Sequence, residues 1–145
     1  MENESVYRCA ECGLELGDVL MRFESGALCH YNDREFVGRC VLALHQHAEH
    51  LEELPPDDFA QLMRDVRLAG RAIRQATGAT RINYAVLGNA APHLHVHLIP
   101  RGGPGDQRGT DTPWGPPEPS LPLPEVEAER LRGALVAALE AEGGD

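Results

Sequence analysis

His93-Leu94-His95-Val96-His97-Leu98-Ile99-Pro100-Arg101 is the stretch that decides the fold. Its histidines alternate with apolar residues, and alternate side chains of a β-strand leave on opposite faces. We therefore expect a strand over residues 93–99 whose three histidines share one face, while Leu94, Val96 and Leu98 enter the core. Neighbouring histidine Cα atoms on that face would lie about 6.5–7 Å apart, so one phosphoryl group could touch two rings.

Three histidines in this arrangement suit chemistry at phosphorus. The ordinary pKa of histidine is about 6.5, so both protonation states are accessible near neutrality. A neutral ring nitrogen can attack phosphorus and form a covalent intermediate. A neighbouring ring can hold phosphate oxygens or protonate a leaving group. Two other interpretations stay open: a strand whose polar face merely carries histidines, and a metal site, because His-x-His is also a chelating spacing.

The elements around this stretch predict an α+β fold, with a mostly antiparallel sheet, a central helix packed on it and a C-terminal helix. Short apolar runs predict strands over residues 19–23, 27–31, 40–44 and 81–87. A helix is expected from Pro56 to a stop at Gly78, because proline fits the first helical turn and glycine the residue after the last. Its buried stripe should comprise Phe59, Leu62, Met63, Val66, Ala69 and Ile73.

The chain is expected to form one domain over residues 1–145, with a core at 5–101, a loop at 102–124 and a final helix at 124–142. The loop holds seven of the eleven prolines, so no regular ladder should survive there. A formal charge of −10 without a basic stripe argues against binding extended nucleic acid. Without a long apolar run or a secretory-type start, we expect no membrane span and a cytoplasmic location.

The complete pattern His93 to Ile99 resembles the signature of the histidine triad (HIT) family. The stretches at 38–47 and 82–92 are also similar to bacterial members, and the resemblance covers about residues 7–101. It implies a small α+β domain, usually paired as a homodimer, that hydrolyses or transfers nucleotidyl groups from dinucleoside polyphosphates, nucleoside phosphoramidates or similar compounds. It makes His95 the nucleophile and places His97 on the phosphate.

The same resemblance assigns substrate contacts to Asn89, Asn83 and Asn32, and places Arg39 and Asp33 beside the ribose or base. Asn89 stands where other branches carry glutamine, and its amide can still donate. Ala90 replaces a serine or threonine of those branches and removes one phosphate donor. The physiological substrate, the nucleobase and the leaving group are therefore not predicted.

Cys9-Ala-Glu-Cys12 has the spacing of a zinc knuckle. Two unrelated thiols or a redox pair are alternatives, although no strand-and-helix pattern supports the redox role. The resemblance to zinc-bearing members completes a structural zinc site as Cys9, Cys12, His47 and His93. The other thiols, Cys29 and Cys40, lie in apolar runs and are expected to be packed in the core.

Two functions remain open on the sequence. One is the nucleotide hydrolase or transferase, and the other is a zinc-stabilised nucleotide-binding or scaffolding protein with little catalysis. Production of AMP from adenosine polyphosphates or a phosphoramidate separates them. Trp114, the only tryptophan, lies in the proline-rich loop and either fills a gap or borders the active site.

Overall fold

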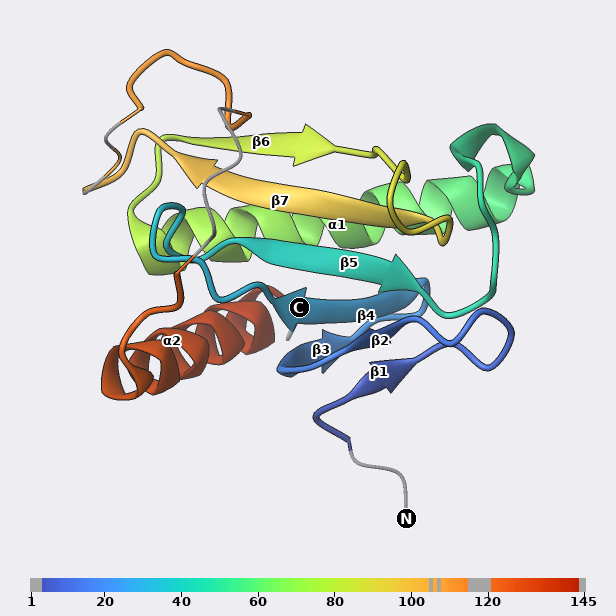
Figure 1. Ribbon diagram of the computed structural model, residues 1–145, viewed down its shortest axis with the longest axis horizontal. Coiled ribbons are helices and arrows are strands. Elements are labelled where there is room, and N and C mark those ends of the chain that lie inside the picture. The colour runs from blue at the N-terminus through green and yellow to red at the C-terminus, as the bar shows by residue number, and fades with distance from the viewer. Residues whose placement is uncertain (1–3, 105, 107, 115–120, 144–145) are drawn as a thin grey trace.

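A five-stranded antiparallel sheet in the order β3-β4-β5-β7-β6 forms the centre of the molecule (Figure 1). The computed structural model describes residues 4–104, 106, 108–114 and 121–143. The sheet confirms the predicted antiparallel arrangement, and β7 lies between β5 and β6. Its strands are β3 (Val19–Arg22), β4 (Gly26–His30), β5 (Cys40–Leu44), β6 (Arg81–Ala85) and β7 (His95–Arg101).

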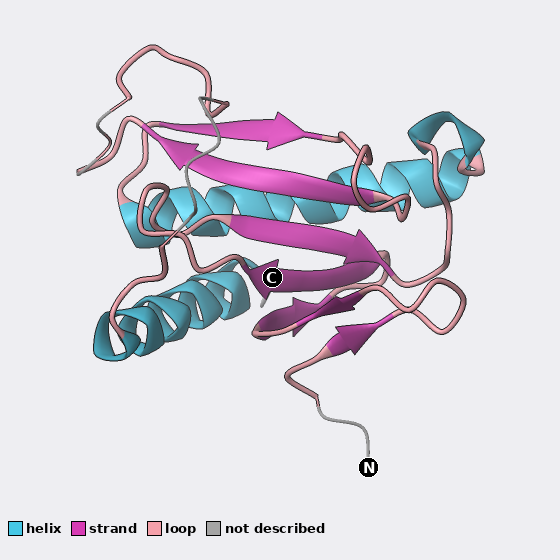
Figure 2. Cartoon of the chain, viewed as in Figure 1, coloured by secondary structure: helices cyan, strands magenta, loops and turns pink. Residues whose placement is uncertain are grey.

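Two helices cover one face of this sheet (Figure 2). The long helix α1 (Pro56–Thr77) begins at a proline and ends at Gly78, whose φ of 75° is the left-handed conformation that closes many helices. Helix α2 (Glu125–Gly143) packs on α1 and β3. A single turn of 3-10 helix, η1 (Leu51–Glu53), precedes α1. The α+β class with a central and a C-terminal helix is therefore confirmed.

The main core lies between the sheet and the helices. Leu94, Val96 and Leu98 are buried there, as their alternation predicts. On α1, Leu62, Val66, Ala69 and Ile73 are buried, but the prediction was wrong for Phe59 and Met63, which are 40% and 36% exposed. A helix of this length spans about 33 Å, whereas a five-residue strand spans about 17 Å, so the first turns of α1 have less sheet beneath them.

A small ribbon of two strands, which the sequence patterns did not predict, packs on the opposite face of the sheet. It consists of β1 (Tyr7–Arg8) and β2 (Glu15–Leu16), paired antiparallel. Tyr7 and Cys9 form a second, smaller core with Ala27, Cys29 and Ala43, which are the residues of β4 and β5 that point away from the helices. The ribbon thereby covers part of the histidine-bearing face.

Several predicted boundaries shift in the structure. Strand β7 starts at His95 rather than His93 and continues to Arg101, and β6 ends at Ala85 rather than residue 87. Within the described part of the 102–124 segment there is no strand, as expected, and residues 115–120 lie outside the description. Among the described residues, no helix has the length and apolar character needed to span a membrane.

Candidate active site and metal centre

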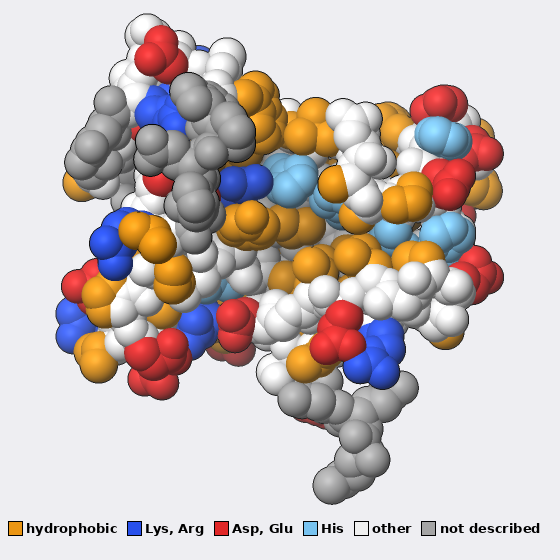
Figure 3. All heavy atoms as spheres, in the orientation of Figure 1, with side chains coloured by type: hydrophobic (Ala, Val, Ile, Leu, Met, Phe, Trp, Pro, Cys, Tyr) orange, Lys and Arg blue, Asp and Glu red, His pale blue; other side chains and the backbone are white. Residues whose placement is uncertain are grey.

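His95 and His97 lie side by side on the face of the sheet that the helices do not cover. Their rings make an edge-to-face contact with centroids 4.9 Å apart. In the register of the sheet they stand opposite Ala43 and Val41 of β5. Figure 3 shows the histidine side chains gathered across the middle of this face, between hydrophobic side chains. The alternation thus brings these two histidines together, as the sequence predicts.

The backbone fixes the protonation of the His95 ring. Nδ1 of His95 lies 2.6 Å from the carbonyl oxygen of His93, and a carbonyl can only accept a hydrogen bond. Nδ1 therefore carries the proton and donates it, and in the neutral ring the lone pair is on Nε2. The unprotonated Nε2 of His95 is therefore directed away from the backbone, which is the arrangement a nucleophile requires.

Arg39 fixes the opposite arrangement in His97. Nη2 of Arg39 lies 3.3 Å from Nδ1 of His97, and a guanidinium can only donate. Nδ1 of His97 therefore accepts, and the ring proton is on Nε2. Burial, with the charge of Arg39 and the neighbouring His95, lowers the pKa of His97 to about 4, so the ring is neutral at pH 7. His97 can then donate one hydrogen bond from Nε2 to an oxygen of a bound anion.

Arg39 is itself held on two sides. Its Nη1 donates to the buried carboxylate of Asp33 at 3.3 Å, and its guanidinium carbon lies 4.2 Å from the ring centroid of Tyr31. The buried Nε has no hydrogen-bond partner among the described residues. The side chain is only 13% exposed, so its charge remains close to His97 instead of swinging into water.

His93 does not share the surface of the other two histidines. It precedes β7, it is 1% exposed, and its side chain turns toward the N-terminal ribbon. Its Nε2 lies 2.9 Å from the carbonyl of Leu44 and 2.8 Å from the hydroxyl of Tyr7. His93 thus lies on the histidine-bearing face, but the N-terminal ribbon buries it there, whereas His95 and His97 remain partly exposed.

Cys9, Cys12, His47 and His93 converge at this place, with one potential ligand atom from each lying within 4.8 Å of all the others. The Nδ1 atoms of His47 and His93 are 3.3 Å apart, Cys12 Sγ is 3.4 Å from His93 Nδ1, and Cys9 Sγ is 3.9 Å from His47 Nδ1. The edges of a tetrahedral zinc site are about 3.3 Å between nitrogens and about 3.6 Å between nitrogen and sulfur. The spacing of the four side chains therefore fits one tetrahedral ion.

The chemistry of the donors agrees with that fit. The backbone N–H of Cys12, directed at the Cys9 sulfur, lowers the pKa of Cys9 and so favours the thiolate that binds metal. Burial lowers the pKa of His93, which favours the neutral ring that ligates through Nδ1. Its other nitrogen then donates to Leu44, the outer contact usual for a metal-bound histidine. All four positions were predicted from the sequence.

The three asparagines expected at the substrate lie in different settings. The side-chain oxygen of Asn83 accepts from Arg101 at 2.9 Å, and that of Asn32 accepts from the backbone N–H of Leu123 at 3.0 Å. Both oxygens are thus engaged within the chain. Asn89 is exposed on the loop before His93, and its contact with substrate stays a prediction.

Two further residues were missed by sequence reasoning. Tyr7 supports both Leu44 and His93, and Tyr31 carries Arg39. Tyr7 lies in a strand of two residues, which is too short to give a periodic signal in the sequence. Tyr31 directly follows β4, where an aromatic residue reads as part of the strand.

Comparison with known proteins gives a family match over the region that holds this site. Residues 22–103, more than half of the chain, match the HIT domain family. The adenylylsulfatase HINT3 of Arabidopsis thaliana is 36% identical over 69 residues, which are 44% of this chain and 35% of that protein. The chain therefore spans about a third of the length of the curated relative it matches.

Solved structures extend the similarity to most of the chain. A histidine triad protein from Sinorhizobium meliloti 1021 is 28% identical, with a TM-score of 0.74 over 83% of this chain and 87% of that one. A zinc-bound histidine triad family protein from Mycobacterium smegmatis shares the fold at 22% identity, with a TM-score of 0.61 over 85% of this chain and 86% of that one. The chain is a member of the histidine triad (HIT) family.

Proposed function

We propose that this protein is a nucleotide phosphohydrolase or nucleotidyl transferase that works through a covalent nucleotidyl-histidine on His95. The observation that carries the proposal is the hydrogen bond from His95 Nδ1 to the His93 carbonyl, because it leaves Nε2 as the free nucleophile. The neighbouring His97, with its proton on Nε2, complements it as a donor to phosphate. A binding surface alone would not need two adjacent rings with opposite tautomers.

The reaction then has two balanced steps. Nε2 of His95 attacks the α-phosphorus, an N–P bond forms, and the bond from phosphorus to the leaving group breaks. The leaving group departs with that electron pair and takes a proton from solvent. Water next attacks the same phosphorus, the N–P bond breaks, and a nucleoside monophosphate is released while the water proton passes to solvent. In a transferase, another nucleophile replaces the water.

His97 and Arg39 act on the negative charge that develops on the phosphoryl oxygens. The Nε2–H of His97 donates to one of these oxygens, and its ring can do so at pH 7 because it is neutral with a fixed proton position. Arg39 holds that position, since its guanidinium occupies Nδ1. In this assignment Arg39 is a positioning residue, whereas His95 and His97 contact the substrate.

We infer that the four-residue cluster holds structural zinc. Four protein ligands leave no open position, so a bound zinc would crosslink the chain and would not activate water. Cys9 and Cys12 would anchor the ribbon, His47 the segment after β5, and His93 the start of the catalytic strand. The zinc-bound relative supports this choice of metal.

Substrates with an adenylyl group on an anhydride or phosphoramidate bond fit this site best, including dinucleoside polyphosphates. The supporting observations are the similarity to the adenylylsulfatase HINT3 and the geometry of the two histidines. A homodimer and a cytoplasmic location stay predictions from the resemblance and the sequence. Light scattering that finds only a 15.8 kDa species at micromolar concentration would contradict the dimer.

The test is turnover with trapping of the intermediate. The protein is incubated with α-labelled diadenosine polyphosphate, adenylyl sulfate and an adenosine phosphoramidate, and AMP and acid-labile protein-bound label are measured. His95→Ala should lose both, with a rate decrease of several orders of magnitude, and should still bind AMP. His45→Ala, an exposed histidine beyond the cluster, is the matched control and should remain near normal. Normal turnover by folded His95→Ala would leave the triad as a binding surface only.

A further inference from the structure

The turn between β4 and β5, residues 31–39, carries both groups that fix the ring of His97. Asp33 and Arg39 form a buried ion pair, and Arg39 donates to Nδ1 of His97. The two carboxylate oxygens of Asp33 have different partners: Oδ2 accepts from Arg39 at 3.3 Å, and Oδ1 accepts from the backbone N–H of Glu35 at 2.8 Å. The turn contains no helix or strand, so the position of this carboxylate depends on what holds the turn from outside.

Residues 121–123, which lead into α2, make the first attachment to this turn. The backbone N–H and Nη2 of Arg34 donate to two carbonyl oxygens of the segment, at 2.8 and 3.3 Å. The side-chain oxygen of Asn32 accepts from the backbone N–H of Leu123 at 3.0 Å. Three hydrogen bonds thus attach the two chain neighbours of Asp33 to one short segment.

The loop after β7 makes the second attachment. The carboxylate of Glu35 accepts from Nε of Arg108. The guanidinium carbon of Arg108 also lies 5.6 Å from the ring centroid of Phe36, which is within the range of a cation–π contact. Phe36 is buried, and the guanidinium carbon of Arg101 lies at the same distance from its ring. One ion pair and two ring contacts therefore join the turn to the loop.

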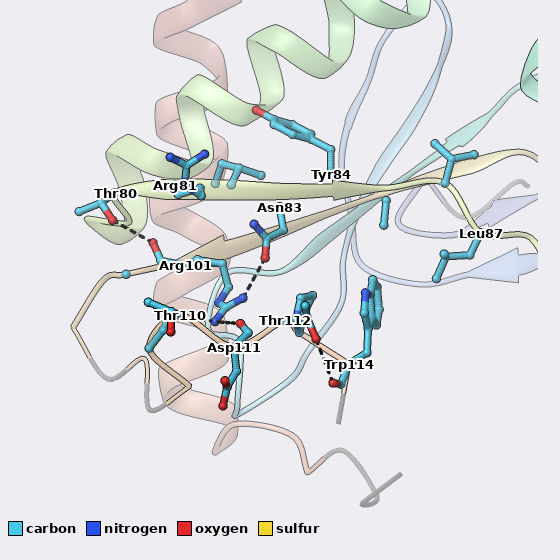
Figure 4. Close-up of a pocket in the computed structure, with 16 residues that line it drawn as sticks. Thr80, Arg81, Asn83, Tyr84, Leu87, Arg101, Thr110, Asp111, Thr112 and Trp114 are labelled. Atoms are coloured by element: carbon cyan, nitrogen blue, oxygen red, sulfur yellow. Dashed lines mark hydrogen bonds between the residues drawn. The ribbon is translucent and has the colours of Figure 1, made fainter. Parts of the chain in front are cut away.

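Arg101, at the end of β7, gives this loop a defined path. The side chain is 6% exposed, and its four hydrogen bonds, of 2.6–3.3 Å, go to Asp106, Asn83, Gly109 and Asp111. Figure 4 shows its guanidinium between Asn83 of β6 and the backbone of Asp111. The carboxylate of Asp106 in turn accepts from the backbone N–H of Arg108 at 2.9 Å. The side chain of Arg108 therefore starts from a backbone that is fixed to β6 and β7.

We propose that Asn32 and Glu35 are positioning residues for His97. Through them the two attachments keep Asp33, and with it Arg39, where the guanidinium meets Nδ1 of His97 and leaves the ring proton on Nε2. The inference rests on the proposed function, in which that Nε2–H donates to phosphate. The resemblance places Asn32 at the substrate, whereas its side-chain oxygen is occupied by the segment before α2. Precise sites commonly depend on such supporting side chains, which hold a reacting group without touching the substrate.

Exchanging the charges of the ion pair tests the second attachment without substrate. Nitrogen-detected NMR of histidine-labelled, metal-replete protein gives the fraction of the Nδ1–H form of His97 in Glu35→Arg, in Arg108→Glu and in the double variant. Each single variant should raise that fraction by up to about fivefold, the range of partly exposed ion pairs, and the double variant should restore the unmutated value. Glu142→Gln, which breaks the ion pair with Arg71 between α1 and α2, is the matched control and should leave the fraction unchanged. An unchanged fraction in both single variants, or no recovery in the double variant, overturns the role of Glu35.

Kinetics and the same NMR measurement test Asn32. Asn32→Ala should raise the Nδ1–H fraction of His97 and lower kcat for AMP release by up to about tenfold, the equivalent of one hydrogen bond, with little change in KM. Asn32→Asp keeps the accepting oxygen and should restore most of kcat. A raised KM with an unchanged tautomer would make Asn32 a substrate contact and overturns its positioning role. If the variants shift the tautomer but the unmutated protein releases no AMP, the proposed function fails and the positioning holds. If AMP is released and Asn32→Ala alters neither kcat nor the tautomer, only the positioning fails.

Discussion

Replacing Arg39 by methionine should allow the ring proton of His97 to move from Nε2 to Nδ1. The bond from the guanidinium to His97 Nδ1 has a charged donor, and such bonds contribute about 1.5–3 kcal/mol, a bias of roughly ten- to a hundredfold between the two tautomers. Without it, we expect a mixture of Nδ1–H and Nε2–H forms. The pKa of His97 should also rise by about one unit from its value near 4, because a positive charge is removed while burial remains.

Nitrogen-detected NMR of histidine-labelled protein measures both quantities without any substrate. Methionine at position 39 leaves the buried Asp33 unpaired, so the double variant Asp33→Asn with Arg39→Met provides a version without that uncompensated charge. Asp33→Asn alone keeps the guanidinium and is the matched control. An Nδ1–H form of His97 in the unmutated protein, or an unchanged tautomer in both Arg39 variants, would refute the assignment. Turnover by the Arg39 variants should fall by no more than the roughly ten- to a hundredfold bias between the two tautomers of His97.

The metal-replete protein should contain about one zinc per chain. Cys9→Ser should lose the metal, and its free energy of unfolding should fall by at least roughly 3 kcal/mol. Elemental analysis that finds less than about 0.2 zinc per chain in the unmutated protein would refute the four-ligand site. Burial, with Arg132 nearby, lowers the pKa of His30 although Asp18 opposes this, so unfolding takes up a proton below about pH 6.5 and stability should fall there by up to about 1.4 kcal/mol per pH unit. Denaturant titrations of His30→Leu should show a flatter pH dependence, and an unchanged slope contradicts the assignment. Arg101→Met should release the loop and shift Trp114 emission to the red, whereas an unshifted spectrum would mean that the loop is held by other contacts.

The sequence predicts most of the fold because its strongest elements carry regular periods. Alternation placed Leu94, Val96 and Leu98 in the core, and the Pro56 and Gly78 signals bounded α1 correctly. The β1–β2 ribbon escaped prediction because two-residue strands have no period to detect. Periodicity also cannot report where a sheet stops, which is why Phe59 was assigned to a core that does not reach it.

The candidate site was predicted in its residues more than in its geometry. Cys9 and Cys12 were found by their spacing, and His47 and His93 by resemblance. The division of the triad into a buried first histidine and two partly exposed histidines follows from the β1–β2 ribbon, which packs on His93 and which no periodic pattern predicted. The contact between Arg39 and His97 joins residues 58 positions apart, and a single sequence carries no signal for such a pair.

His93 contributes to two centres through two different parts of itself. Its imidazole faces Cys12 and His47, while its carbonyl oxygen accepts the hydrogen bond from the Nδ1–H of His95. Every amino acid has that carbonyl, so a substitution at 93 deletes the imidazole and spares the acceptor. Catalysis in such a variant should survive in the cold and fail on warming, as the unanchored turn begins to fluctuate. The proposed zinc would thereby set the upper temperature limit of the proposed activity rather than its intrinsic rate.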